Sequence, residues 1–210
     1  MESGLMKISD YISTDIFIND VRPPWEVCHL AAEIVGSWIA RLTRHFRITD
    51  GVAIHETATV ELGAVLKAPC IIGPDCFVAA YAYLRGGVWL DKTVIIGPSS
   101  EIKSSFICAN SKAAHLNFIG DSVIGENVNI EAGAILANFR NEWEVKEIIC
   151  FDGVNYIHTK LNKFGSLIGD GCRIGAGSVL APGVILKKGA IIKRLSSIDQ
   201  IPIEMQKLIG

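Results

Sequence analysis

Residues 54–102 read IHETATVELGAVLKAPCIIGPDCFVAAYAYLRGGVWLDKTVIIGPSSEI, and this stretch repeats with a fixed period. Every sixth residue is aliphatic, and the residue four positions after each of them is small or of modest size. The aliphatic positions are Ile54, Val60, Leu66, Ile72, Val78, Leu84, Leu90, Ile96 and Ile102, and the small ones are Ala58, Ala64, Cys70, Cys76, Ala82, Val88, Val94 and Ser100. A period of six fits neither an amphipathic helix nor a simple hairpin sheet. It is typical of an all-β solenoid, the parallel β-helix built from hexapeptides.

Side-chain alternation along a strand gives this period a geometry. Residues two apart on a strand point to the same side, so Ala64 and Leu66 both face inward while the residue between them faces outward. Turns then follow the aliphatic residue, at pairs such as Gly73-Pro74. Three hexapeptides make a triangular coil of about 18 residues, and coils stack about 4.8 Å apart. The predicted inward ladders begin Ile54–Ile72–Leu90, Val60–Val78–Ile96 and Leu66–Leu84–Ile102. A β-sandwich with chance periodicity is the alternative.

Composition narrows the class of protein. The chain has 210 residues, half of them hydrophobic, which is enough to bury one substantial core. A net charge of −2 without a basic run gives no footprint for nucleic acid. No apolar run approaches the ~20 residues of a membrane span, and none is typical of a signal peptide, so no membrane association is expected. Six cysteines include no C-x-x-C pair, and three take the inward small position, which favours a reduced, cytoplasmic protein.

The chain divides into three parts. Residues 1–50 form an N-terminal extension, in which Pro23-Pro24 precedes apolar residues spaced three and four apart up to Leu42. This spacing predicts one amphipathic helix of about five turns that caps the solenoid or lies along its first coils. A membrane-surface helix is the alternative. Residues 51–197 form the β-helix, with an excursion at 140–162 that contains a hairpin around Asp152-Gly153. Residues 198–210 form a tail, expected to hold a short closing helix.

We expect the chemistry where the regular repeat breaks. The irregular coils carry the motifs Lys112-Ala113-Ala114-His115-Leu116, Ile119-Gly120-Asp121, Gly125-Glu126-Asn127-Val128-Asn129-Ile130, Ala132-Gly133 and Asn138. In this order and spacing they resemble the acetyltransferase domain of the bacterial bifunctional N-acetylglucosamine-1-phosphate uridyltransferase, over roughly residues 54–194. The later Asn162-Lys163-Phe164-Gly165 is more similar to archaeal relatives of that enzyme. The resemblance implies a left-handed β-helix, a homotrimer, and transfer of acetyl from acetyl-CoA to an amino-sugar 1-phosphate.

The resemblance also implies roles for individual residues. The implied catalytic residues are His115, as general base, and Asn138. The implied ligands of the sugar and its phosphate are Arg85, Lys103, Asn129, Lys163 and Phe118, the last in place of a tyrosine. The implied contacts of the coenzyme are Ala132 and Ala176. Two departures put the sugar in doubt: Phe139 replaces a second tyrosine, and Glu131 replaces a glycine.

These residue types suit the chemistry independently of the resemblance. An amine that attacks a thioester must lose a proton, and a histidine with a reference pKa of about 6.5 can accept it. Arginine and lysine make strong charge-assisted bonds to phosphate, and an asparagine amide can stabilise an oxyanion. We further expect Lys187, Lys188, Lys193 and Arg194 to cluster on the last coils, with Lys193 and Arg194 holding the phosphates of the coenzyme. His115 would then lie between cationic groups on one side and amides on the other.

The sequence therefore predicts an acetyl-CoA-dependent N-acetyltransferase acting on an amino-sugar phosphate or a nucleotide amino sugar. No uridyl transfer is expected, because the Gly-rich nucleotidyltransferase domain is absent. One alternative is an acyltransferase that uses acyl carrier protein, as in lipid A synthesis; another is a catalytically silent sugar-binding scaffold. A zinc site of the γ-carbonic anhydrase kind needs a close pair of histidines in register, which the five histidines do not supply, so no metal is expected.

A homotrimer is also predicted from the outward positions. Ile71, Trp89 and Ile107 would form an outward apolar ladder, which needs cover from partner chains or from the N-terminal helix.

Overall fold

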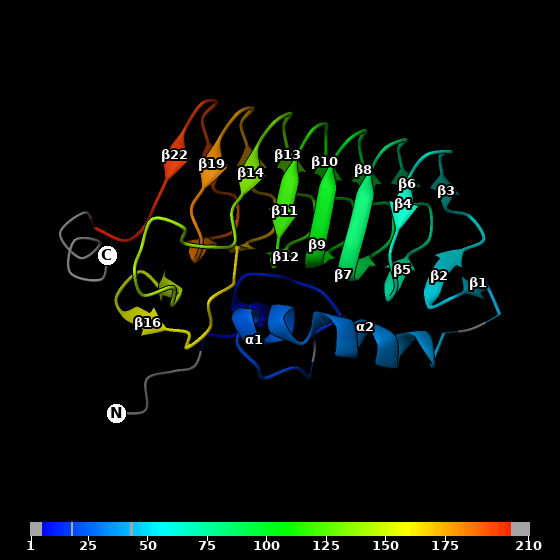
Figure 1. Cartoon of the computed structure of the whole chain (residues 1–210), viewed down its shortest axis with the longest axis horizontal. Helices are drawn as coiled ribbons and strands as arrows, with labels where there is room; N and C mark the ends of the chain where they lie inside the picture. The colour runs from blue at the N-terminus through cyan, green and yellow to red at the C-terminus, as the bar shows by residue number, and fades with distance from the viewer. Residues whose placement is uncertain (1–5, 18, 43, 203–210) are drawn as a thin grey trace.

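The computed structural model of the chain describes residues 6–17, 19–42 and 44–202. It confirms the predicted architecture, a left-handed parallel β-helix preceded by a helical segment (Figure 1). Short parallel strands stack coil upon coil into three faces, which we call A, B and C. The strands of each face are given in the next paragraph, and the chain passes through the faces in the order B, A, C. The predicted β-sandwich alternative is therefore wrong, because the strands pair in parallel with partners one coil away.

The strands of each face follow one another at coil intervals. Face A contains β4 (Val65–Leu66), β11 (Phe118–Gly120), β14 (Ile135–Leu136), β19 (Val179–Leu180) and β22 (Ser197–Ile198), with the first halves of β7 (Tyr83–Leu90) and β9 (Glu101–Ile107). Face B contains β3 (Thr59–Val60), β6 (Phe77–Val78), β8 (Ile95–Ile96), β10 (Lys112–Ala113), β13 (Asn129–Ile130), β18 (Arg173–Ile174) and β21 (Ile191–Ile192). Face C contains β2 (Val52–His55), β5 (Cys70–Ile72), β12 (Val123–Ile124), β17 (Ser166–Ile168) and β20 (Val184–Leu186), with the second halves of β7 and β9.

The strand register confirms the three inward ladders and shows where the coil length changes. Ile54 pairs with Ile72 and Ile72 with Leu90, each 18 residues on, whereas Leu90 pairs with Ile107 after only 17. Shortening the coil by one residue keeps the aliphatic side chain inward because the missing residue is taken from a corner. The ladders form a continuous buried core along the axis of the solenoid.

The N-terminal segment differs from the single helix predicted. It contains the 3-10 turn η1 (Ile8–Asp10) and two helices, α1 (Pro24–His29) and α2 (Ala31–Ile39), because the backbone leaves the α region at Leu30 (φ −94°, ψ 13°). The helices lie along one side of the stack (Figure 1) and pack on β5, β7 and β9, as the second predicted placement required. Edge-to-face aromatic pairs seat the segment on the sheet, at Phe17–Phe106, Trp25–Phe164 and Trp38–Trp89.

This placement corrects the outward ladder drawn from the sequence. Because the coil after Leu90 has 17 residues, the residue in register with Trp89 is Phe106, and Ile107 points inward. The ladder Ile71–Trp89–Phe106 belongs to the second hydrophobic cluster, which the N-terminal segment covers. Its apolar surface is therefore buried within one chain and does not itself call for a partner chain.

An antiparallel hairpin begins the solenoid. Strand β1 (Phe46–Thr49), which falls inside the expected N-terminal extension, pairs with β2 through a two-residue turn at Asp50-Gly51. Both turn residues have positive φ (49° and 76°), as a tight type I′ connection requires. The hairpin thus occupies the first edge of face C, which would otherwise expose unpaired strand groups.

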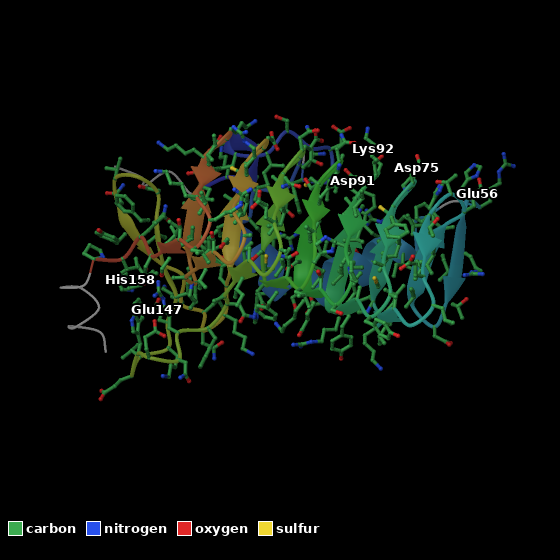
Figure 2. The ribbon with its side chains drawn as sticks, turned by 90° about the horizontal axis from the view of Figure 1, so that it is seen from above. Glu56, Asp75, Asp91, Lys92, Glu147 and His158 are labelled. Carbon is green, nitrogen blue, oxygen red and sulfur yellow. The ribbon has the colours of Figure 1, made fainter. Side chains whose placement is uncertain are left out.

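The excursion leaves the stack at the corner between faces A and C. It contains the predicted hairpin, β15 (Ile149–Phe151) with β16 (Tyr156–His158), near which His158 Nδ1 lies 3.2 Å from Glu147 Oε2 (Figure 2). Its start is held by Arg140, whose guanidinium is buried and bonds to both carboxylate oxygens of Asp199 at 2.5 and 2.8 Å. The expected closing helix lies mostly at 203–210, outside the described residues. No helix in the described ranges combines the length and hydropathy needed to cross a membrane.

Candidate active site

The corner between faces A and C holds a cluster of polar side chains centred on the buried Asp121. Lys103 Nζ donates to both carboxylate oxygens of Asp121, at 2.8 and 2.7 Å. The Asn138 amide nitrogen donates to the same carboxylate from the next coil. The Asp121 side chain is 7% exposed and that of Lys103 is 15% exposed. Cation, carboxylate and amide therefore form one unit, which we call the Asp121 cluster.

Local backbone geometry builds this cluster. Asp121 follows strand β11 with a positive φ of 45°, which turns its carboxylate back towards the preceding coil. Gly120 leaves room for the cluster, because a Cβ there would lie 2.7 Å from the Asn138 amide nitrogen and 2.8 Å from the Phe118 ring, and these side chains would have to move. Phe118 thus lies on the outer surface of face A, beside the Asp121 cluster.

Arg85 lies one coil before Lys103 and in register with it, as predicted. Its Nε bonds to Glu101 Oε1 at 2.8 Å, and its guanidinium carbon lies 5.8 Å from the Tyr83 ring centre. Both nominated phosphate ligands on this corner are thus already paired with carboxylates. Lys163 is exposed at the end of the excursion, directly before Phe164, whose N–H donates to the Asn138 carbonyl at 3.2 Å.

The corner between faces B and A carries the residues nominated for the base and the coenzyme. His115 is exposed, and its backbone carbonyl accepts a hydrogen bond from Gly133 N–H. The carbonyl of Ala132 accepts one from Gly177 N–H in turn, at 2.9 Å. His115, Ala132 and Ala176 therefore follow one another along this corner, one coil apart. Asn117, which is buried, fixes the turn by bonding to His115 N–H and to the Glu131 carbonyl.

Glu131 occupies this same corner as the centre of an ion pair. Its carboxylate bonds to Arg194 Nε and to a terminal nitrogen of Arg194, both at 2.8 Å, and accepts Ala176 N–H at 2.9 Å. The bonds from Arg194 and Ala176 lower the pKa of the Glu131 carboxyl. The nominated coenzyme ligand Arg194 is thus engaged by the residue that replaces the family's glycine.

The four basic residues of the last coils do not form one cluster. Lys187 and Lys188 follow β20 at the corner between faces C and B, whereas Lys193 and Arg194 follow β21 at the corner between faces B and A. Lys188 is held by Asp170 at 3.0 Å. The expectation is wrong because each pair follows a different strand of the same coil. Other charged residues lie on the corner between faces C and B in earlier coils. They are Asp75 after β5, and Asp91 and Lys92 after β7, all labelled in Figure 2.

Asn129 lies on face B and not with the other nominated amide. Its strand partners are Lys112 and Arg173. It lines a groove of about 230 Å³ together with Glu131, Arg173, Lys193 and Arg194. Arg173 was not singled out from the sequence. The sequence did contain a signal, because Arg173 stands between the inward residues Cys172 and Ile174 and must therefore point outward. The structure adds that it is in register with Asn129.

The nominated residues therefore occupy two ends of face A and the adjoining groove of face B. Strand β11 has three residues at about 3.3 Å each, so face A is roughly 10 Å wide between its corners. His115 and Asp121 lie in the turns before and after this strand. The expected division into cations on one side and amides on the other is wrong, because Lys103 and Asn138 converge on Asp121. The carboxylate could have been found from the sequence, since Asp121 follows Lys103 by one coil length.

Other titratable groups give no metal site. Among the described residues, no group of three or more histidines, cysteines, aspartates or glutamates is arranged to hold a metal ion. His45 is paired with Glu56 at 2.6 Å and His55 with Thr57 at 3.0 Å. Burial raises the pKa of the Cys70 and Cys76 thiols to about 12, which makes both poor nucleophiles.

Comparison with known proteins agrees with the resemblance found in the sequence. Residues 48–148 match the family model described as the GMPPB C-terminal domain. The chain is 35% identical over 136 residues to the bifunctional protein GlmU of Carboxydothermus hydrogenoformans, covering 64% of this chain and 30% of that protein. It is 33% identical over 162 residues to GlmU of Methanococcus vannielii, covering 74% of this chain and 38% of that protein. The chain thus spans about a third of the length of these relatives.

A solved structure is more distantly similar. It is a mutant of AntD, an N-acyltransferase from Bacillus cereus in complex with dTDP and coenzyme A, with 15% identity and a TM-score of 0.39 over 70% of this chain and 72% of that one. At this level it carries no argument about function. Together with the register of the strands, the relatives make this chain a hexapeptide-repeat β-helix that resembles the acetyltransferase domain of GlmU.

Proposed function

We propose that the chain transfers an acetyl group from acetyl-CoA to the amine of an amino-sugar phosphate or nucleotide amino sugar. The substrate lies across face A, with its anionic end at Arg85 and Lys103 and its amine near His115. The observation that carries the proposal is the register of β9 and β11, which sets the nominated cations and the nominated base at opposite ends of one outward strand surface. The strand between them is roughly 10 Å long, which leaves room for a sugar on face A.

The residues divide the work by position. Arg85 and Lys103 bind phosphate oxygens through charge-assisted bonds, and Lys163 adds a third cation from the excursion. Phe118 offers an apolar surface to the sugar ring. His115 takes the proton that the amine loses as its nitrogen attacks the thioester carbonyl. The C–S bond breaks once the C–N bond has formed, and the protonated imidazole can then give the proton to the departing thiolate.

The coenzyme end falls on the corner between faces B and A and on the groove of face B. The backbone at Ala132 and Ala176 meets the thioester arm, and Asn129 lines the groove beside it. Lys193 and Arg194 meet its phosphates. For Arg194 this requires the guanidinium to exchange a Glu131 oxygen for a phosphate oxygen, which is feasible because the Arg194 side chain is 72% exposed.

The direct test is release of free thiol from acetyl-CoA across a panel of amino sugars with and without a 1-phosphate or nucleotide. Turnover with a phosphorylated or nucleotide-linked amino sugar supports the proposal. Turnover only with acyl carrier protein as donor would favour the lipid A type of reaction. Absence of turnover with every pair would favour a silent sugar-binding scaffold.

His115→Ala tests the base. We expect turnover to fall by about 10²–10⁴ with little change in acetyl-CoA binding, because a general base acts on the chemical step. The fold should persist, since His115 is exposed and lies outside the inward ladders. His158→Ala is the control, because His158 lies in the excursion, paired with Glu147. More than about a tenth of the activity left in His115→Ala would assign the base to another group.

A further inference from the structure

The N-terminal segment packs on residues that adjoin the Asp121 cluster in the corner between faces A and C. Its first contact is at Gly87, in the corner between faces A and C, where φ is 90°. A Cβ on Gly87 would lie 2.5 Å from the Ala31 carbonyl carbon and closer still to the Ala32 nitrogen. The first turn of α2 therefore rests directly on this corner, against backbone that cannot yield as a flexible side chain would.

The same corner, through Gly86, lies next to Ser104 and so to Lys103. The corner lies close to the next coil, because a Cβ on Gly86 would lie 2.7 Å from Ser104 Oγ. Ser104 Oγ in turn accepts a weak hydrogen bond from Lys103 Nζ at 3.4 Å. The corner that α2 contacts thus also adjoins Lys103.

The second contact is made by Trp25 of α1. Trp25 is 4% exposed and packs edge-to-face on Phe164, with ring centres 6.1 Å apart. Phe164 N–H donates to the Asn138 carbonyl at 3.2 Å, and Gly165 N–H donates to the Asp121 carbonyl at 2.8 Å. Helix α1 therefore holds the strand entry that fixes two members of the Asp121 cluster.

The thiol of Cys28, also on α1, confirms how near the helix lies. Burial raises the pKa of this thiol, the Asp121 charge raises it further, and the Lys103 charge lowers it. Both charges of the ion pair are thus within electrostatic reach of α1, and Cys28 itself is 1% exposed.

We propose that the N-terminal segment is part of the site, with Gly87 and Trp25 as positioning residues that hold Lys103, Asp121 and Asn138 in the arrangement that binds the anionic end of the substrate. The inference rests on the proposed function. It predicts that disturbing either contact weakens binding of the amino-sugar phosphate. The coenzyme end, on the corner between faces B and A, is not touched by these contacts and should be unaffected.

Two matched pairs of variants test the proposal. Gly87→Ala introduces a Cβ against α2, and its control Gly171→Ala has a similar positive φ of 68° with nothing within 4 Å of the added atom. Trp25→Leu removes the ring on Phe164, and its control Phe46→Leu removes an edge-to-face ring on His55 in the first hairpin, outside α1 and α2. Gly87→Ala and Trp25→Leu should raise KM for the amino-sugar phosphate about tenfold while kcat and KM for acetyl-CoA change less than about twofold. The controls should change none of the three.

Amide hydrogen exchange gives a readout that does not depend on activity. The amides of Asp121, Phe164 and Gly165 should exchange about tenfold faster in Gly87→Ala and Trp25→Leu than in the two controls. Faster exchange with an unchanged KM would overturn the inference and leave the proposed function standing. If the wild-type chain acetylates no amino sugar, the proposed function fails, and exchange alone decides whether the segment positions the cluster. Unchanged exchange at all three amides would overturn the positioning role.

Discussion

Two ion pairs of similar length on the same corner allow burial to be separated from distance. Lys103 Nζ lies 2.7 Å from Asp121, with side chains 15% and 7% exposed, whereas an Arg85 terminal nitrogen lies 2.6 Å from Glu101, with side chains 37% and 33% exposed. At 2.7 Å and an effective dielectric constant of ~20, the Coulomb attraction is about 6 kcal/mol before desolvation is subtracted. Desolvation offsets part of this for the inner pair, and solvent screens most of it for the outer one.

A double-mutant cycle on each ion pair measures the coupling free energy between its two charges. For Lys103→Met with Asp121→Asn we expect a coupling free energy of about 2–4 kcal/mol, because either single change leaves a buried charge without its counterion. The double variant should be more stable than either single variant. For Arg85→Met with Glu101→Gln we expect less than about 1 kcal/mol.

The assay is chemical unfolding at one protein concentration, followed by circular dichroism, with the free energy of unfolding extrapolated to water. Asp121 also accepts the Asn138 amide, so Asp121→Asn is preferred to alanine because it keeps the shape of the side chain. Equal coupling energies for the two pairs would refute the reasoning that burial, and not distance, makes the Lys103–Asp121 pair the stronger of the two. A coupling below about 1 kcal/mol for the inner pair would do so as well.

The remaining predictions concern stability. Arg140→Met should lower the free energy of unfolding by about 3–5 kcal/mol, because it removes a buried guanidinium that bonds to both oxygens of Asp199 and to the Pro182 carbonyl. Limited proteolysis should then cut within 141–162, and resistance there would contradict the anchoring role. Partial burial would raise the pKa of Asp170, yet bonds from Glu126 N–H, Lys188 and Ser13 lower it overall. The contribution of Asp170 to the free energy of unfolding is therefore present above the unfolded pKa of about 3.9 and lost as the pH falls through the folded pKa. In Asp170→Asn, the free energy of unfolding measured by denaturant titration should fall less steeply below about pH 4 than in the wild type. Ile119→Ala should lower the free energy of unfolding by about 2–5 kcal/mol in the same assay, because Ile119 is fully buried. Leu116, which is 65% exposed, should cost less than about 0.5 kcal/mol when replaced by alanine, and equal costs would contradict the inward register.

The period of six determined the solenoid from the sequence alone. An inward aliphatic residue every six positions is a local property, because strand alternation and turn chemistry act within one hexapeptide, and stacking then only repeats it. Ile54, Ile72 and Leu90 could therefore be placed in one ladder from the printed letters. The hairpin of the excursion was also predictable, since Asp152-Gly153 between two apolar runs is a local turn signal.

The tertiary structure decided what depends on contacts between distant segments. Loss of one residue in the coil between Leu90 and Ile107 moved Phe106 into the outward ladder in place of Ile107, and only the pairing of strands reveals a change of that kind. No local rule states which face an amphipathic segment covers. The N-terminal segment is held on the sheet by aromatic pairs, of Phe17 with Phe106, Trp25 with Phe164 and Trp38 with Trp89. The same holds for the candidate site. Its residue types were legible in the sequence, but the neutralisation of Lys103 by Asp121 and of Arg194 by Glu131 arises from side chains on different coils, whose distances only the folded chain sets.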